Sequence, residues 1–145
     1  MISKKIGKLE FSLLKGTISK NSYEESIIKL SLASKNGFVQ LVPSKLIAGE
    51  NHLFIALENT LSSFESKSNF AKKPELELII RLTGIKQLNK ALKKAEFGKE
   101  DLVLIIGSKN KSKISEIKKD LGFIEKSFEL GKNKNYLIKF FKITK

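Results

Sequence analysis

The sequence predicts a single α/β domain over residues 1–145, with a mixed sheet of about five strands flanked by four or five helices. Three observations support this fold class. The chain is long enough for one domain with a sizeable core. Its hydrophobic content of 41% is ordinary for a globular fold. Apolar residues recur at spacings of two in some segments and of three or four in others.

The N-terminal part reads as a strand followed by a helix. Residues 6–18 alternate apolar and polar side chains, which predicts a strand with one buried face. Ser22 and Glu25 form a capping box, which satisfies the first free amides of a helix. We expect this helix to run to about Ser34 and to end in a left-handed turn at residues 36–37.

A second strand and a long helix follow. Residues 38–42 form a short apolar strand, and Pro43 suits the first turn of a helix. The helix should reach about Ser66, and Gly49 is the position where it could break or kink. Apolar residues recur along it at helical spacing: Leu46, Leu53, Leu57, Leu61 and Phe64.

The only arginine of the chain, Arg81, falls in the next apolar segment. Residues 67–74 are polar and are expected to form a loop, and residues 75–82 alternate with a period of two, which predicts a strand. Leu76, Leu78, Ile80 and Leu82 would share one face. The other face would carry Glu75, Glu77, Ile79 and Arg81. Arginine offers a planar fork for phosphate or carboxylate, so a single Arg81 among 27 lysines marks a candidate site.

Two lysine-rich helices, two strands and a final helix are expected in the remainder. A helix should follow Gly84, the continuous apolar run 102–106 predicts a strand covered on both faces, and a short helix should end at Gly122. A weak strand over 123–130 and a final helix over 133–142 complete the prediction. The outward helix faces are basic, and they serve either as solvated surfaces or as a groove for phosphates: Lys86, Lys90, Lys93, Lys94, Lys111, Lys113, Lys118 and Lys119.

The net charge of +13 predicts a polyanionic partner. Nucleic acid is the first candidate, and an acidic protein or a lipid surface is the second. The sequence shows no helix-turn-helix or zinc-finger pattern, so no DNA binding is expected. Few aromatic residues fall at positions expected to be exposed, which favours recognition of one short single-stranded end over a broad stacking sheet.

Enzyme and metal signatures are missing from the sequence. The chain has no cysteine and one histidine, His52, so we expect no catalytic residue, no metal site and no cofactor. An acid–base role for Glu75, Glu77 and His52 stays open as a third function, although pairing to basic groups is more common for such glutamates. No signal peptide or membrane span is recognised, and a soluble cytoplasmic protein with no membrane partner is expected.

Two motifs in the middle of the chain resemble a known family. Gly49 and His52 fit a Gly-x-x-His pattern at a helix start, and Gly84, Gln87 and Ala91 fit Gly-x-x-Gln-hydrophobic-x-x-Ala after the glutamate-containing segment. Their types and order resemble the small accessory subunit of the KEOPS complex, which binds the atypical kinase of that complex.

The resemblance is specific over residues 49–92. The chain length, the element order and the ending at residues 140–144 extend it loosely to the whole chain. Leu88 stands where the family commonly has isoleucine, and Lys86 stands where it often has arginine, which removes a bidentate side chain from that position.

The resemblance implies a non-catalytic subunit in the synthesis of threonylcarbamoyladenosine on tRNA. Its partners would be the kinase-like ATPase subunit and the single-stranded 3′ CCA end of tRNA. A regulator that binds only protein, with lysines serving solubility, is the alternative function.

The implied tRNA contacts comprise a nucleotide-end pocket and nearby phosphate contacts: Arg81, Gly84, Lys86 and Gln87, with Lys72, Lys73 and Asn69. The kinase contact is expected on the final helix: Leu137, Phe140, Phe141 and Ile143. Structural alternatives are open for both sets. Gly84 could only turn the chain, Gln87 could cap a helix, Arg81 could pair with Glu75 or Glu77, and the final helix could face the core. His52 is expected to be structural, bonding the turn near Gly84.

Overall fold

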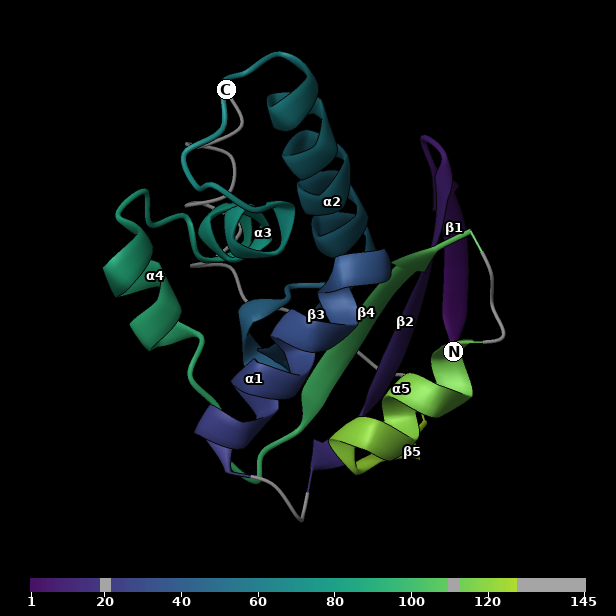
Figure 1. The fold of residues 1–145 in the computed structure, drawn as a ribbon. Helices are drawn as coiled ribbons and strands as arrows, with labels where there is room; N and C mark the ends of the chain where they lie inside the picture. The colour runs from purple at the N-terminus through teal and green to yellow at the C-terminus, as the bar shows by residue number, and fades with distance from the viewer. Residues whose placement is uncertain (19–21, 110–112, 128–145) are drawn as a thin grey trace. The chain divides into compact units, whose positions relative to one another are not determined.

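A computed structural model describes residues 1–18, 22–109 and 113–127 of this chain (Figure 1). Within that part it contains five strands and five α-helices, which confirms the α/β class. The described chain divides into two compact units, one of Met1–Pro43 with the chain from Phe97 onward, and one of Ser44–Glu96. The single domain over residues 1–145 stays a prediction.

The first unit is built on one sheet whose strands run in the order β1-β2-β4-β3, with β5 also paired to β2. The strands are β1 (Ile2–Ile6), β2 (Leu9–Ile18), β3 (Phe38–Pro43), β4 (Leu102–Ser108) and β5 (Phe123–Lys126). Every pairing among the described strands is antiparallel, so the expectation of a mixed sheet is corrected. The long β2 borders β1 and β5 on one side and β4 on the other.

The predicted strand over residues 6–18 corresponds mainly to β2, and the sequence did not predict β1, which precedes it and forms a hairpin with it. The chain turns at Gly7, whose φ of 62° is left-handed, and β1 pairs with the first half of β2. Polar Ser3, Lys4 and Lys5 hid β1 from the apolar pattern, because this edge strand exposes them. The buried β4 and the short β5 agree with their predictions.

Helices α1 (Tyr23–Ala33) and α5 (Lys113–Leu121) pack beside each other in this unit (Figure 1). The predicted capping box is present, since the Glu25 amide donates to Ser22 Oγ at 3.2 Å. The short turn η1 (Ser34–Asn36) continues α1. Gly37 is extended, with a φ of 166°, so the predicted left-handed stop is wrong there.

The second unit consists mainly of three helices, α2 (Glu50–Glu65), α3 (Pro74–Thr83) and α4 (Leu88–Lys94). Helix α3 packs against both α2 and α4. Pro43 ends β3 rather than starting a helix, and a short turn η2 (Ser44–Leu46) follows it. Helix α2 begins only after Gly49, which is its N-cap, so Gly49 is the break that the sequence left open.

The most consequential correction concerns α3, because residues 75–82 form a helix and not a strand. Its start and end carry helix signals: Pro74 is at the first position, and Gly84 closes the helix with a left-handed φ of 73°. Every residue from Glu77 to Thr83 is buried. A helix buried on all sides has no polar face to reveal its 3.6-residue period, so the local alternation was misleading.

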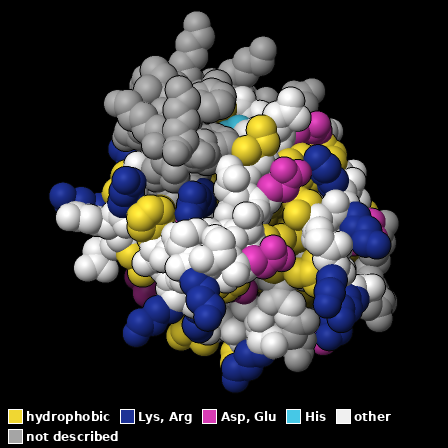
Figure 2. All heavy atoms as spheres, turned by 90° about the horizontal axis from the view of Figure 1, so that it is seen from above, with side chains coloured by type: hydrophobic (Ala, Val, Ile, Leu, Met, Phe, Trp, Pro, Cys, Tyr) yellow, Lys and Arg dark blue, Asp and Glu magenta, His cyan; other side chains and the backbone are white. Residues whose placement is uncertain are grey.

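Lysines are dispersed over the surface. On the face drawn in Figure 2, Lys and Arg side chains are scattered around the described surface among fewer Asp and Glu side chains. The predicted outward lysines of α4 and the turn before it are exposed: Lys86, Lys90, Lys93 and Lys94. Among the described helices, none is both long enough and apolar enough to cross a membrane.

Candidate nucleic-acid interface

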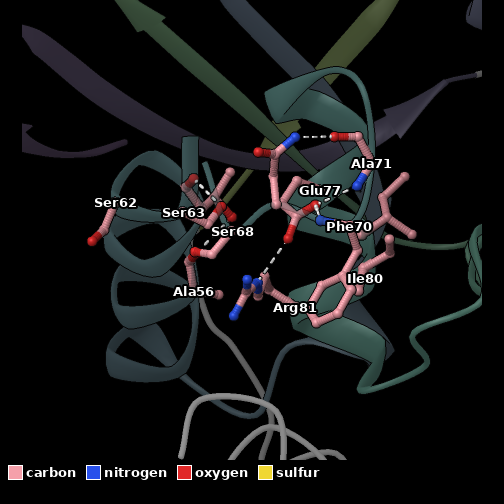
Figure 3. Close-up of polar contacts among 12 residues, drawn as sticks. Ala56, Ser62, Ser63, Ser68, Phe70, Ala71, Glu77, Ile80 and Arg81 are labelled. Carbon is pink, nitrogen blue, oxygen red and sulfur yellow. Dashed lines mark hydrogen bonds and ion pairs between the residues drawn. The ribbon is translucent and has the colours of Figure 1, made fainter. Parts of the chain in front are cut away.

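A buried carboxylate organises the segment between α2 and α3. Glu77 lies in the first turns of α3, and its exposed fraction is 0%. Its Oε1 accepts hydrogen bonds from the backbone amides of Phe70 at 2.8 Å and Ala71 at 2.7 Å (Figure 3). The Asn69 side chain donates to the Ala71 carbonyl at 2.7 Å, which closes the same turn. The helix therefore fixes the backbone of the loop that precedes it.

Arg81 completes this arrangement one helical turn later. Its Nε donates to Glu77 Oε2 at 3.0 Å, an i,i+4 pair on α3. The arginine side chain is only 9% exposed, so it does not lie on a solvated strand face as the sequence predicted. The structural alternative of pairing with Glu77 is confirmed. Because both charges are buried, each depends on the other for compensation.

The loop presents one aromatic ring to solvent beside two cations. Phe70 is 49% exposed, and Arg81 Cζ lies 5.2 Å from the centre of its ring. Lys86 Nζ lies 5.7 Å from the same centre. Both distances are within the range of cation–π contacts. Figure 3 shows the Phe70 ring next to the Arg81 side chain, and the dashed line from Arg81 leads to the Glu77 carboxylate.

The structure therefore brings two predicted site residues, Arg81 and Lys86, to one ring. Lys72 and Lys73 are exposed on the loop that carries the ring, while Asn69 is half-buried in its turn. Phe70 and the role of Glu77 were not predicted from the sequence. An exposed aromatic next to a Lys-Lys pair was the available signal for Phe70, and the i,i+4 spacing to Arg81 was the signal for Glu77.

The turn after α3 has a structural role. The Gly84 amide donates to the Ile80 carbonyl at 2.9 Å in a left-handed cap, so the expectation that Gly84 turns the chain is confirmed. Gln87 is exposed at the N-cap of α4, and its side chain makes no capping hydrogen bond, so the capping alternative is wrong.

His52 holds the backbone before α2. Its Nδ1 accepts a hydrogen bond from the Ala48 amide at 2.9 Å, which supports the expected structural role, while a bond to the turn near Gly84 stays a prediction. Burial lowers the pKa of His52 from 6.5 to about 4, which keeps the ring neutral at physiological pH. Two of the three acid–base candidates, Glu77 and His52, thus accept hydrogen bonds from backbone amides.

Within the described ranges, no cluster of three or more His, Cys, Asp or Glu residues could hold a metal ion. The predicted kinase contacts lie outside the described residues: Leu137, Phe140, Phe141 and Ile143. No protein-family model matches this chain, and no curated protein sequence matches it.

Proposed function

We propose that this protein is a non-catalytic subunit of a KEOPS-type complex that recruits tRNA through its single-stranded 3′ CCA end and binds the atypical kinase. The observation that carries the tRNA part is the exposed Phe70 ring with Arg81 and Lys86 beside it. The family resemblance of the motifs over residues 49–92 supplies the identity of the complex.

The chemistry of this cluster suits an unpaired nucleotide end. An aromatic ring binds any base that is free to stack, and each stacked base contributes about 1–3 kcal/mol. Lys86, Lys72 and Lys73 are exposed and can approach the phosphates on the 5′ side of the base. A base inside a duplex presents no free face to the ring, so the site favours a single-stranded end.

Arg81 has a different role in this proposal from the one that its residue type suggested. Its Nε is committed to Glu77, and its guanidinium lies over the Phe70 ring. It therefore positions the ring and adds positive potential, while Lys86 makes the accessible contact. The kinase contact is proposed on Leu137, Phe140, Phe141 and Ile143.

The tRNA proposal is tested with two variants that remove surface groups. Phe70→Leu removes the aromatic face and keeps an apolar side chain, and Lys86→Gln removes one cation. Lys5→Gln is the control, because it removes the same charge from an exposed position on β1. Affinity is measured for intact tRNA and for the same tRNA lacking the CCA end.

We expect both site variants to bind intact tRNA more weakly and to bind truncated tRNA as the wild type does. The control variant should keep the wild-type difference in affinity between the two RNAs. Equal affinity of the wild-type protein for the two RNAs would remove the 3′ end from the proposal. A wild type with no salt-dependent RNA binding would instead leave a regulator that binds only protein.

The kinase contact is tested by co-purification of the kinase with the full chain. Phe140→Glu should abolish this co-purification at unchanged thermal stability.

A further inference from the structure

Helix α1 has an exposed apolar stripe in the unit that contains the sheet. Ile28 is 63% exposed and Leu32 is 58% exposed, four residues apart on the same face of the helix. Glu25 is exposed in the first turn of α1, and Lys35 is exposed in η1, the short turn that continues α1. The spacings from 25 to 28 and 32 are three and four, which is the pattern of a helix seam that meets another helix, and Lys35 lies three residues beyond Leu32. We define Glu25, Ile28, Leu32 and Lys35 as the α1 stripe.

A groove lies directly beside this stripe, between α1 and α5. It has a volume of about 400 Å³, and Leu32 forms part of its wall together with Ile117 and Leu121. The groove thus offers an apolar recess next to two exposed apolar side chains. An aliphatic side chain from another molecule would be removed from water there.

The charges around the groove cancel. Two lysines and two acids line it, Lys29 and Lys113 with Glu116 and Asp120. The net charge of +13 makes two copies of the chain repel each other, and the balanced charges at this groove add nothing to that repulsion. A surface with balanced charges and apolar side chains is the kind of surface where two such copies can approach each other.

The α1 stripe is also complementary to itself. If two α1 helices pack antiparallel about position 30, Ile28 of one copy faces Leu32 of the other. The same axis places Glu25 of one copy opposite Lys35 of the other. Each contact then occurs twice, as a two-fold interface requires. The Ile28 side chain would enter the groove beside Leu32 of the second copy.

We propose that two copies of this chain associate through antiparallel α1 helices, with Ile28 of each copy seated in the α1–α5 groove of the other. This inference does not rest on RNA or kinase binding. An 11-residue helix is about 16 Å long. Its contact surface is smaller than a standard stable interface, so the association is weak and depends on concentration.

Sedimentation velocity over a concentration series, at constant ionic strength, tests the apolar part. We expect the weight-average sedimentation coefficient of the wild type to rise with concentration, and that of Ile28→Glu to stay at the monomer value. Ile124→Glu is the matched control, because Ile124 is 54% exposed on β5. This variant should associate like the wild type. A wild type that is monomeric at every concentration overturns the proposal and leaves the stripe to a different partner. So does association that survives Ile28→Glu.

A charge-swap experiment tests the antiparallel register. In Glu25→Lys the amide of residue 25 can still donate to Ser22 Oγ, although the Ser22 hydroxyl loses the Glu25 carboxylate as its acceptor. Lys35→Glu reverses the charge at the opposite end. Each variant alone should associate about tenfold more weakly, because like charges then meet at both ends. An equimolar mixture should recover wild-type association, since each charge finds its opposite in the other variant. Circular dichroism checks that α1 is retained, and a mixture no better than the single variants overturns the register.

Discussion

The buried pair in α3 should make Glu77→Gln strongly destabilising. The glutamine oxygen can still accept the two loop amides, but its NH₂ group then faces Arg81 Nε, and two donors meet at the 3.0 Å separation now bridged by the carboxylate. The guanidinium also loses its counter-charge, and because the Arg81 side chain is only 9% exposed, water can hardly replace it. Removing one partner of a buried pair costs about 3–5 kcal/mol. In a chain of this size, that lowers Tm by about 10 °C or more.

Thermal and urea unfolding of the wild type and three variants measure this effect. Glu75→Gln is the matched control in the first turn of the same helix, and it should change stability by less than about 1 kcal/mol. Glu77→Gln with Arg81→Met removes the stranded charge, so the double variant should recover part of the loss. A cost below about 1 kcal/mol for Glu77→Gln, or no recovery in the double variant, would refute the reasoning.

Three further predictions concern pH, the α3 cap and the loop lysines. Burial lowers the pKa of His52 to about 4, so the stability that its neutral ring contributes is complete above pH 6.5 and is lost as pH falls through 4. His52→Gln should remove this pH dependence, so that the unfolding free energy falls by up to about 3 kcal/mol less between pH 6.5 and 4 than it does in the wild type. Gly84→Ala forces a side chain into a φ of 73° and should cost about 1–2 kcal/mol in urea unfolding, and an unchanged midpoint would contradict this. If Lys72 and Lys73 each neutralise one phosphate, replacing both by Gln should reduce the slope of log affinity against log salt by about 1.4, whereas an unchanged slope would show that they remain solvated.

Local signals predicted several elements well. The capping box located the start of α1 because it depends on only four neighbouring residues, Ser22 to Glu25. The continuous apolar run from Leu102 identified β4 because both faces of that strand are covered. Such patterns express the burial that the element itself experiences.

The remaining differences arise from tertiary structure. Helix α3 was predicted as a strand because neighbours bury it on every side and no polar face marks its period. Arg81 was accordingly expected at the surface, whereas the helix places it one turn from Glu77. The position of the half-exposed Phe70 depends on hydrogen bonds from two backbone amides to the Glu77 carboxylate, which lies seven and six residues further along the chain. No local sequence pattern encodes these bonds. The predicted final helix at residues 133–142 lies outside the described residues.

The central claim is that the Phe70 ring receives the single-stranded 3′ end of tRNA. Its most direct test is the ratio of the affinity for intact tRNA to that for tRNA lacking CCA, measured for the wild type and for Phe70→Leu. Loss of one stacked base predicts that the substitution lowers this ratio by about fivefold to 150-fold. A ratio that is the same in both proteins would contradict the account.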